Sequence, residues 1–100
     1  MNIEINKESA TRTVATVNGW LSSAEAEEFS EKLLPLAGEP GELALDLAGL
    51  EYISSAGIRC FLQLLKASKA AGSKLILVNM LPQVKDIFSL TALLDKFDLE

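Results

Sequence analysis

Residues 42–78, ELALDLAGLEYISSAGIRCFLQLLKASKAAGSKLILV, contain the pattern that decides the fold. Leu43–Leu47 and Ser73–Val78 include short apolar runs of the kind found in strands buried on both faces. Between them a helix is expected from about Ala56 to Ala71, with Gly72 suited to a left-handed C-cap. Because a strand–helix–strand unit makes a right-handed crossover, we expect the two strands to be parallel in one sheet.

The predicted helix has an apolar face and a polar face. Apolar side chains recur at intervals of three and four residues, which favours a helix packed on a sheet. The segment between Tyr52 and Leu81 contains four basic residues and no acid, so one surface of the protein is expected to be basic. The residues expected to face the core are Ile58, Phe61, Leu62 and Leu65, and those expected on the opposite face are Arg59, Gln63, Lys66 and Lys69.

The flanking segments continue the alternation of strands and helices. Thr and Val at alternate positions favour a strand near the N-terminus, and Gly and Pro residues mark the loops. The expected order predicts one α/β domain, residues 1–100. We expect a hairpin of Met1–Asn6 and Thr11–Asn18 that ends at Gly19, a helix capped by Ser22 or Ser23 and running to about Leu36, a connecting loop at 48–53, a helix over Pro82–Ser89, and an amphipathic stretch over Thr91–Phe97.

The composition argues against several classes of protein. The 100 residues carry a net charge of −5, which disfavours a nucleic-acid surface or a polybasic membrane anchor. The chain has no His and one Cys, so the common zinc sites, Cys/His and Ser/His catalysis and an internal disulfide are not expected. No apolar stretch approaches the roughly 18 residues that a membrane span needs. We therefore expect a cytoplasmic protein that is not an enzyme and that needs no metal or cofactor.

A pair of serines, Ser54 and Ser55, lies where the central helix begins. The N-terminus of a helix has unpaired backbone N–H groups and a positive dipole end, and both favour an anion. A phosphoryl group on Ser55 would meet this positive end and would add a charge of about −1.5 to −2 to the surface. Ser is also a favoured N-cap, and Gly57 suits either a turn or the close approach of a partner. Local chemistry therefore leaves both interpretations of the pair open, cap and phosphoacceptor.

The central stretch resembles the bacterial anti-sigma factor antagonists, which are single-domain members of the STAS family. The resemblance rests on the apolar strand that ends in Asp46, an aromatic and an aliphatic residue, and the Ser-Ser-Ala-Gly-Ile signature that opens the helix. It extends more weakly to VNGWL at 17–21 and to PQVKDIF at 82–88. It implies a STAS-like α/β fold, with a curved, mixed but mostly parallel sheet of about four to five strands and about four helices packed on one side.

The resemblance also implies a function in a bacterial partner-switching pathway. In that family an unphosphorylated antagonist binds a serine-kinase anti-sigma factor with a histidine-kinase-like ATPase fold, and so releases a sigma factor or another target. Phosphorylation by the kinase abolishes the binding, and a PP2C-type phosphatase restores it. By position the phosphoacceptor is Ser55, with Ser54 as the second choice. The free protein is expected to be a monomer.

The residues around the acceptor are expected to form the phosphorylation loop and the partner interface, namely Ser22, Asp46, Ser54, Ala56, Gly57, Ile58 and Arg59. Many members of the family have acids at the positions of Ser22 and Ser54, and several have Ser or Thr at the position of Ala56. We interpret these departures as changes of partner specificity that leave the switch intact.

Other functions are compatible with the same features. A STAS subunit of a membrane transporter complex would use the fold as a scaffold, without phosphorylation of the serine. A small-molecule or nucleotide module would use the helix N-terminus, although the chain has no Gly-rich phosphate loop. Structural explanations also exist for single residues: Asp46 bonding loop amides, Trp20 packing at a strand end, and Cys60 as a small, partly buried thiol.

Overall fold

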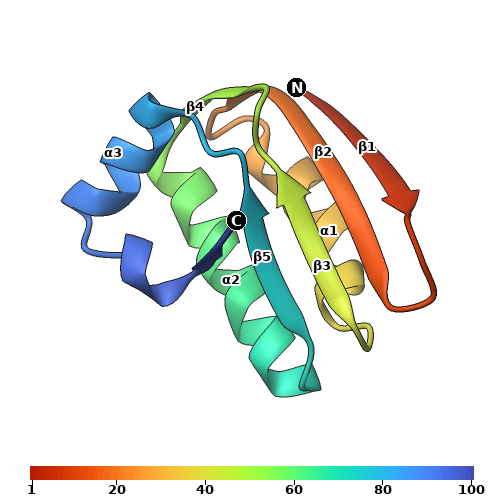
Figure 1. The fold of residues 1–100 in the computed structure, drawn as a ribbon. Coiled ribbons are helices and arrows are strands. Elements are labelled where there is room, and N and C mark those ends of the chain that lie inside the picture. Colours follow the sequence, from red (N-terminus) through yellow and green to blue (C-terminus); the bar gives the residue numbers. More distant parts are fainter.

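The computed structural model describes residues 1–100 and consists of a mixed sheet with helices packed mainly against one face (Figure 1). The chain runs through β1 (Asn2–Lys7), β2 (Arg12–Leu21), α1 (Ala26–Ala37), β3 (Glu42–Asp46), β4 (Leu50–Ile53), α2 (Ser55–Ala71), β5 (Lys74–Val78), α3 (Pro82–Leu90), the 3-10 helix η1 (Leu94–Lys96) and β6 (Asp98–Leu99).

The sheet is organised around three parallel strands, and its order is β1-β2-β3-β5-β6. β2 pairs with β3, and β3 pairs with β5, in parallel register. The parallel β3–β5 pair confirms the predicted crossover through α2. β1 pairs antiparallel with β2, which confirms the N-terminal hairpin. The short β6, which the sequence pattern did not predict, extends the sheet by pairing parallel with β5.

β2 changes partner along its length. Its first half pairs with β3 and its last residues pair with β4, with a shift of register between Gly19 and Trp20. Gly19 has a φ of 104°, a backbone conformation that glycine adopts without a side-chain clash. The prediction that Gly19 ends the strand was therefore wrong, because it forms a bulge within β2. The predicted loop at 48–53 was correct for the turn at Ala48 and Gly49 and wrong for Leu50–Ile53, which form β4 because the redirected end of β2 gives them a strand to pair with.

The core lies between the sheet and the helices. α1 and α2 lie side by side against one face of the sheet, and α3 lies beyond them near β4 (Figure 1). At the centre, the ring of Phe61 stacks on that of Phe29 at a centroid distance of 5.3 Å. The same ring makes edge contacts with Phe88 at 5.5 Å and with Phe97 at 6.4 Å. Phe61 of α2 therefore packs against α1, α3 and the segment that precedes β6.

The helices differ from the sequence prediction in detail. The N-cap of α1 is Glu25 and not Ser22 or Ser23, because the carbonyl of Ser22 accepts from the Glu25 amide at 3.1 Å in a turn that precedes the helix. α1 continues through Pro35 to Ala37. There are three α-helices and one 3-10 helix in place of about four helices, since the last amphipathic stretch forms only a single short turn.

The central helix α2 begins one residue earlier than expected and ends at the predicted Gly72, whose φ of 71° is left-handed. Its core face is also rotated from the prediction. Leu64 is fully buried, whereas Leu62 and Leu65 are only partly buried. The C-terminal segment covers that side of α2 incompletely, which leaves a groove.

The face of the sheet that the helices leave open carries an ion-pair cluster around Arg12. Its guanidinium contacts Glu42 at 3.0 Å, Glu100 at 3.4 Å and Glu8 at 3.4 Å. The hydrogen bond to Glu42, together with the neighbouring carboxylates, raises the pKa of Arg12. The cluster joins the hairpin, β3 and the C-terminal residue.

Candidate functional site

The two serines at the start of α2 have different structural roles. Ser54 is the N-cap, with extended backbone angles, and its Oγ accepts a hydrogen bond from the Gly57 amide at 3.1 Å. Ser55 is the first residue of the helix and is exposed, and its Oγ makes no hydrogen bond within the chain. Side-chain capping therefore occupies the Ser54 hydroxyl and leaves the Ser55 hydroxyl accessible.

The first turn of α2 offers hydrogen-bond donors to an anion. The amide of Gly57 donates to the Ser54 side chain, and that of Ile58 donates to the Ser54 carbonyl at 2.9 Å. The amides of Ser55 and Ala56 precede the first intrahelical bond, so they have no acceptor within the helix. A negative group on Ser55 would lie at the positive end of a helix of 17 residues.

The site is held in place by the ends of β2 and β4. The Ser54 amide donates to the carbonyl of Leu21 at 2.9 Å, and Ser22 is the next residue after this contact. Gly57 is buried against the same two strands. A Cβ added at Gly57 would lie 2.8 Å from both Leu21 Cγ and Ile53 Cγ1. Glycine at this position therefore lets the first turn of α2 pack closely on the sheet.

The other predicted site residues fall into two groups. Ala56 is partly exposed and Arg59 is exposed on α2. Gly57 and Ile58 are buried, with Ile58 only 8% exposed, so their contribution is to position the turn from within the core.

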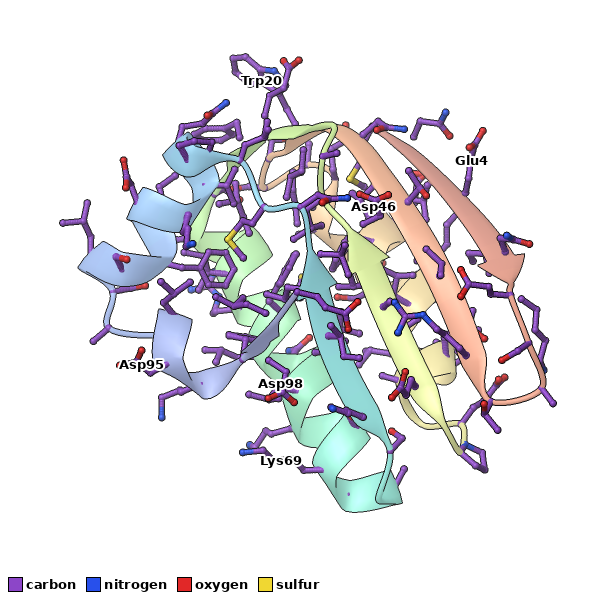
Figure 2. The ribbon with its side chains drawn as sticks, viewed as in Figure 1. Glu4, Trp20, Asp46, Lys69, Asp95 and Asp98 are labelled. Carbon is purple, nitrogen blue, oxygen red and sulfur yellow. The ribbon has the colours of Figure 1, made fainter.

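Asp46 lies at the end of β3, close to the edge of the sheet that carries the loop (Figure 2). Its Oδ1 accepts from the Ala48 amide at 3.2 Å and from Asn79 Nδ2 at 3.3 Å. These bonds join the turn after β3 to the turn after β5. They do not extend to residues 54–59, so Asp46 makes no side-chain hydrogen bond to the predicted phosphorylation loop.

An exposed aromatic pair next to the serines was missed by sequence reasoning. Trp20 is 60% exposed and Tyr52 is 41% exposed, and their ring centroids lie 5.3 Å apart. Trp20 Nε1 donates to Glu51 Oε2 at 3.4 Å. Figure 2 shows Trp20 projecting beyond the carboxyl edge of the sheet. In the sequence, the only sign of this pair is that each aromatic residue comes directly before an aliphatic residue that is buried in the structure. The contact between the two rings could be predicted only by recognising that residues 50–53 form the strand β4.

Cys60 is the small thiol that the sequence predicted, but it is buried where partial burial was expected, and the chain has no second cysteine. Its sulfur lies 3.0 Å from Ser30 Oγ and 3.4 Å from the Ala26 carbonyl, so it connects α2 to α1.

A groove of about 580 Å³ lies along the C-terminal half of α2, away from the serine loop. Lys69 of α2 and Asp95 of η1, both labelled in Figure 2, belong to it. The groove is lined by Leu62, Leu65, Lys66, Lys69, Leu93, Asp95 and Lys96.

No group of three or more His, Cys, Asp or Glu side chains is placed to hold a metal ion. None of the helices combines the length and apolar character needed to cross a bilayer.

The chain belongs to the STAS domain family, whose model matches residues 2–100. Among curated relatives, a protein named as an anti-sigma factor antagonist, BtrV of Bordetella bronchiseptica, is 34% identical over 84% of this chain and 73% of its own length. The anti-sigma-B factor antagonist of Bacillus subtilis is 29% identical over 99% of this chain and 92% of its own length.

Solved structures share the fold over nearly the whole chain. The anti-sigma factor antagonist SpoIIAA in its unphosphorylated form superposes with a TM-score of 0.83 at 17% identity, covering 99% of this chain and 88% of that one. The phosphorylated form of Bacillus SpoIIAA gives a TM-score of 0.76, also at 17% identity, covering 99% and 91%. The murine anion transporter Slc26a9 is similar over 84% of this chain but only 14% of its own, with a TM-score of 0.70 at 26% identity. The STAS-like α/β fold expected from the sequence is confirmed.

Proposed function

We propose that this protein is an anti-sigma factor antagonist whose binding is switched by phosphorylation of Ser55. The observation that carries the proposal is the division of roles between the two serines. Ser54 uses its hydroxyl to cap α2, whereas Ser55 is exposed and has an unengaged hydroxyl at the positive end of the helix. The names of the relatives from Bordetella and Bacillus support the assignment to antagonists.

The chemistry required of the chain is that of a phosphoryl acceptor. The Ser55 oxygen forms a bond to the γ-phosphorus of ATP, the bond to the ADP oxygen breaks, and the hydroxyl proton leaves to a base of the kinase. The product carries a charge of about −1.5 to −2 beside the amides of Ser55 and Ala56. Because the side chain is exposed, the fold can accept this charge without burying it.

Loss of partner binding follows from the place of the charge. The partner is a serine-kinase anti-sigma factor of histidine-kinase-like ATPase fold, whose nucleotide must face Ser55 during transfer. After transfer, the phosphoserine faces the phosphates of the ADP, and like charges at short range are repelled. The modified antagonist is released, and a PP2C-type phosphatase removes the phosphate and restores binding. The unmodified antagonist occupies the kinase, which frees a sigma factor or another target.

The proposal is tested by binding and by mass mapping. The purified anti-sigma kinase from the same organism is expected to capture wild type and Ser55→Ala, and to capture Ser55→Asp poorly. Ser54→Ala serves as the matched control, since it removes the neighbouring hydroxyl and leaves the acceptor. After incubation with kinase and ATP, the phosphate is expected on Ser55. If Ser55→Asp is captured as well as the other variants, or if the phosphate is found on another residue, the assignment of Ser55 is refuted.

A scaffold function in a transporter is the second candidate, and the likeness to part of Slc26a9 is the observation that favours it. In that case the protein would co-purify with an integral membrane transporter, and Ser55→Asp would leave the association unchanged. Co-purification with a kinase that Ser55→Asp abolishes would rule it out.

A further inference from the structure

The aromatic patch, defined here as Trp20, Tyr52 and Glu51, is exposed although the protein has a large apolar core. Both rings stand beside each other on adjacent parallel strands, where Trp20 is in register with Tyr52. Neither ring belongs to the buried core cluster. Large aromatic side chains gathered on a surface, unlike single exposed residues, are typical of protein interaction sites.

The backbone that carries the patch is anchored in the core. Leu21 and Ile53, the next residues of the two strands, are 0% and 2% exposed and pack beneath Gly57. These contacts fix the backbone from which both rings project, and the indole N–H of Trp20 is held by the Glu51 carboxylate. A preformed pair of rings loses little conformational entropy on binding, which is a property of binding hot spots.

The chemistry of the patch selects a cation. Each ring offers the negative face of its π system, and the Glu51 carboxylate adds a formal negative charge at the edge of the indole. Glu51 makes no ion pair within the chain, so its charge is available to a partner. An arginine fits best, because its planar guanidinium stacks on aromatic faces and also donates to a carboxylate.

The patch lies next to the proposed acceptor. Tyr52 is two residues before the cap Ser54 and three before Ser55, and Trp20 precedes Leu21, whose carbonyl binds the Ser54 amide. A protein surface that covers Ser55 therefore also reaches the rings.

We infer that the aromatic patch binds an arginine-bearing surface of the anti-sigma kinase, beside the nucleotide that faces Ser55. This inference rests on the proposed function. It separates two contributions to the interface: the rings supply affinity in both phosphorylation states, and Ser55 supplies the switch.

The test is a set of dissociation constants for the purified kinase, measured by calorimetry with ADP present. Trp20→Ala is expected to weaken binding about 30-fold or more, the usual loss for a central aromatic hot spot. Glu51→Arg is expected to weaken it at least as much, because it places a cation opposite the partner's arginine. Leu90→Ala is the matched control, since Leu90 is 87% exposed and lies at the end of α3. It is expected to leave the dissociation constant unchanged.

Each outcome separates the two proposals. If wild type binds, Ser55→Asp does not and Trp20→Ala binds like wild type, the inference is overturned and the switch stands. If wild type fails to bind the kinase, the proposed function itself fails. If Trp20→Ala disturbed the fold, its unfolding temperature would be lower than that of wild type. In that case the dissociation constant of Glu51→Arg tests the inference, because Glu51 is exposed. Light scattering that shows a wild-type dimer dissociated by Trp20→Ala would reassign the patch to self-association and overturn the inference.

Discussion

Replacement of Gly57 by alanine tests the close packing that positions the serine loop. The added Cβ would lie 2.8 Å from Leu21 Cγ, 2.9 Å from Leu21 Cδ2 and 2.8 Å from Ile53 Cγ1. A Cβ atom does not approach non-bonded carbon atoms this closely, so either the two side chains or the first turn of α2 must move. Both side chains are buried at the ends of their strands, which leaves little room for them to rotate away.

Two opposing effects set the magnitude. Overpacking of a filled core costs about 1 to 3 kcal/mol. Alanine in place of glycine within a helix stabilises by up to about 1 kcal/mol. The steric cost is the larger, because three contacts fall below 3.0 Å at once. We expect Gly57→Ala to lower the free energy of unfolding by about 1 to 2 kcal/mol. Each kcal/mol lost lowers the Tm of a domain of this size by roughly 4 to 8 °C.

Urea unfolding followed by far-UV circular dichroism measures the change, with Gly38→Ala as the matched control. Gly38 has a φ of −83°, and a Cβ there would meet its nearest atoms at ordinary distances of 3.7 and 3.9 Å. The same substitution is therefore expected to be neutral or to stabilise by up to about 1 kcal/mol. If Gly57→Ala proves as stable as wild type, or if Gly38→Ala loses as much, the packing argument is refuted.

Three further predictions concern the cap, the core and the thiol. Ser54→Ala removes the bond to the Gly57 amide and is expected to cost about 1 kcal/mol in urea unfolding, whereas Ser55→Ala changes stability by less than about 0.5 kcal/mol; equal losses would contradict the assigned roles. Phe61→Ala leaves a cavity among three other aromatic rings and is expected to cost about 3 to 5 kcal/mol, which a small loss of urea midpoint would disprove. Cys60 is 6% exposed, so Ellman's reagent is expected to react slowly with the native protein and rapidly in urea, and fast native labelling would count against the packing around it.

The parts of the fold that were predicted depend on short-range patterns. The hairpin follows from alternation in Thr11–Asn18, and the β3–α2–β5 unit follows from apolar runs that flank one amphipathic helix. Gly72 was placed correctly because only its immediate neighbours decide a left-handed C-cap. The family resemblance likewise depends on contiguous residues, and the match over residues 2–100 confirms it.

The parts that were missed depend on partners far away in the chain. β4 has only four residues, and its existence requires the bulge at Gly19 to turn the end of β2 toward it. The short β6 exists only because β5 offers a free edge. Neither strand has a periodicity long enough to identify it from its own residues.

At the candidate site, the sequence by itself determined that a serine pair opens an amphipathic helix after a buried strand, and that the family resemblance points to the second serine. Only the tertiary structure decided how the two hydroxyl groups differ, because the cap bond to Gly57 depends on the backbone angles of Ser54. It also decided why residue 57 is glycine and why Trp20 stands beside Tyr52. Those facts depend on contacts between β2 and β4, whose residues lie about 30 positions apart in the chain, and packing alone brings them together.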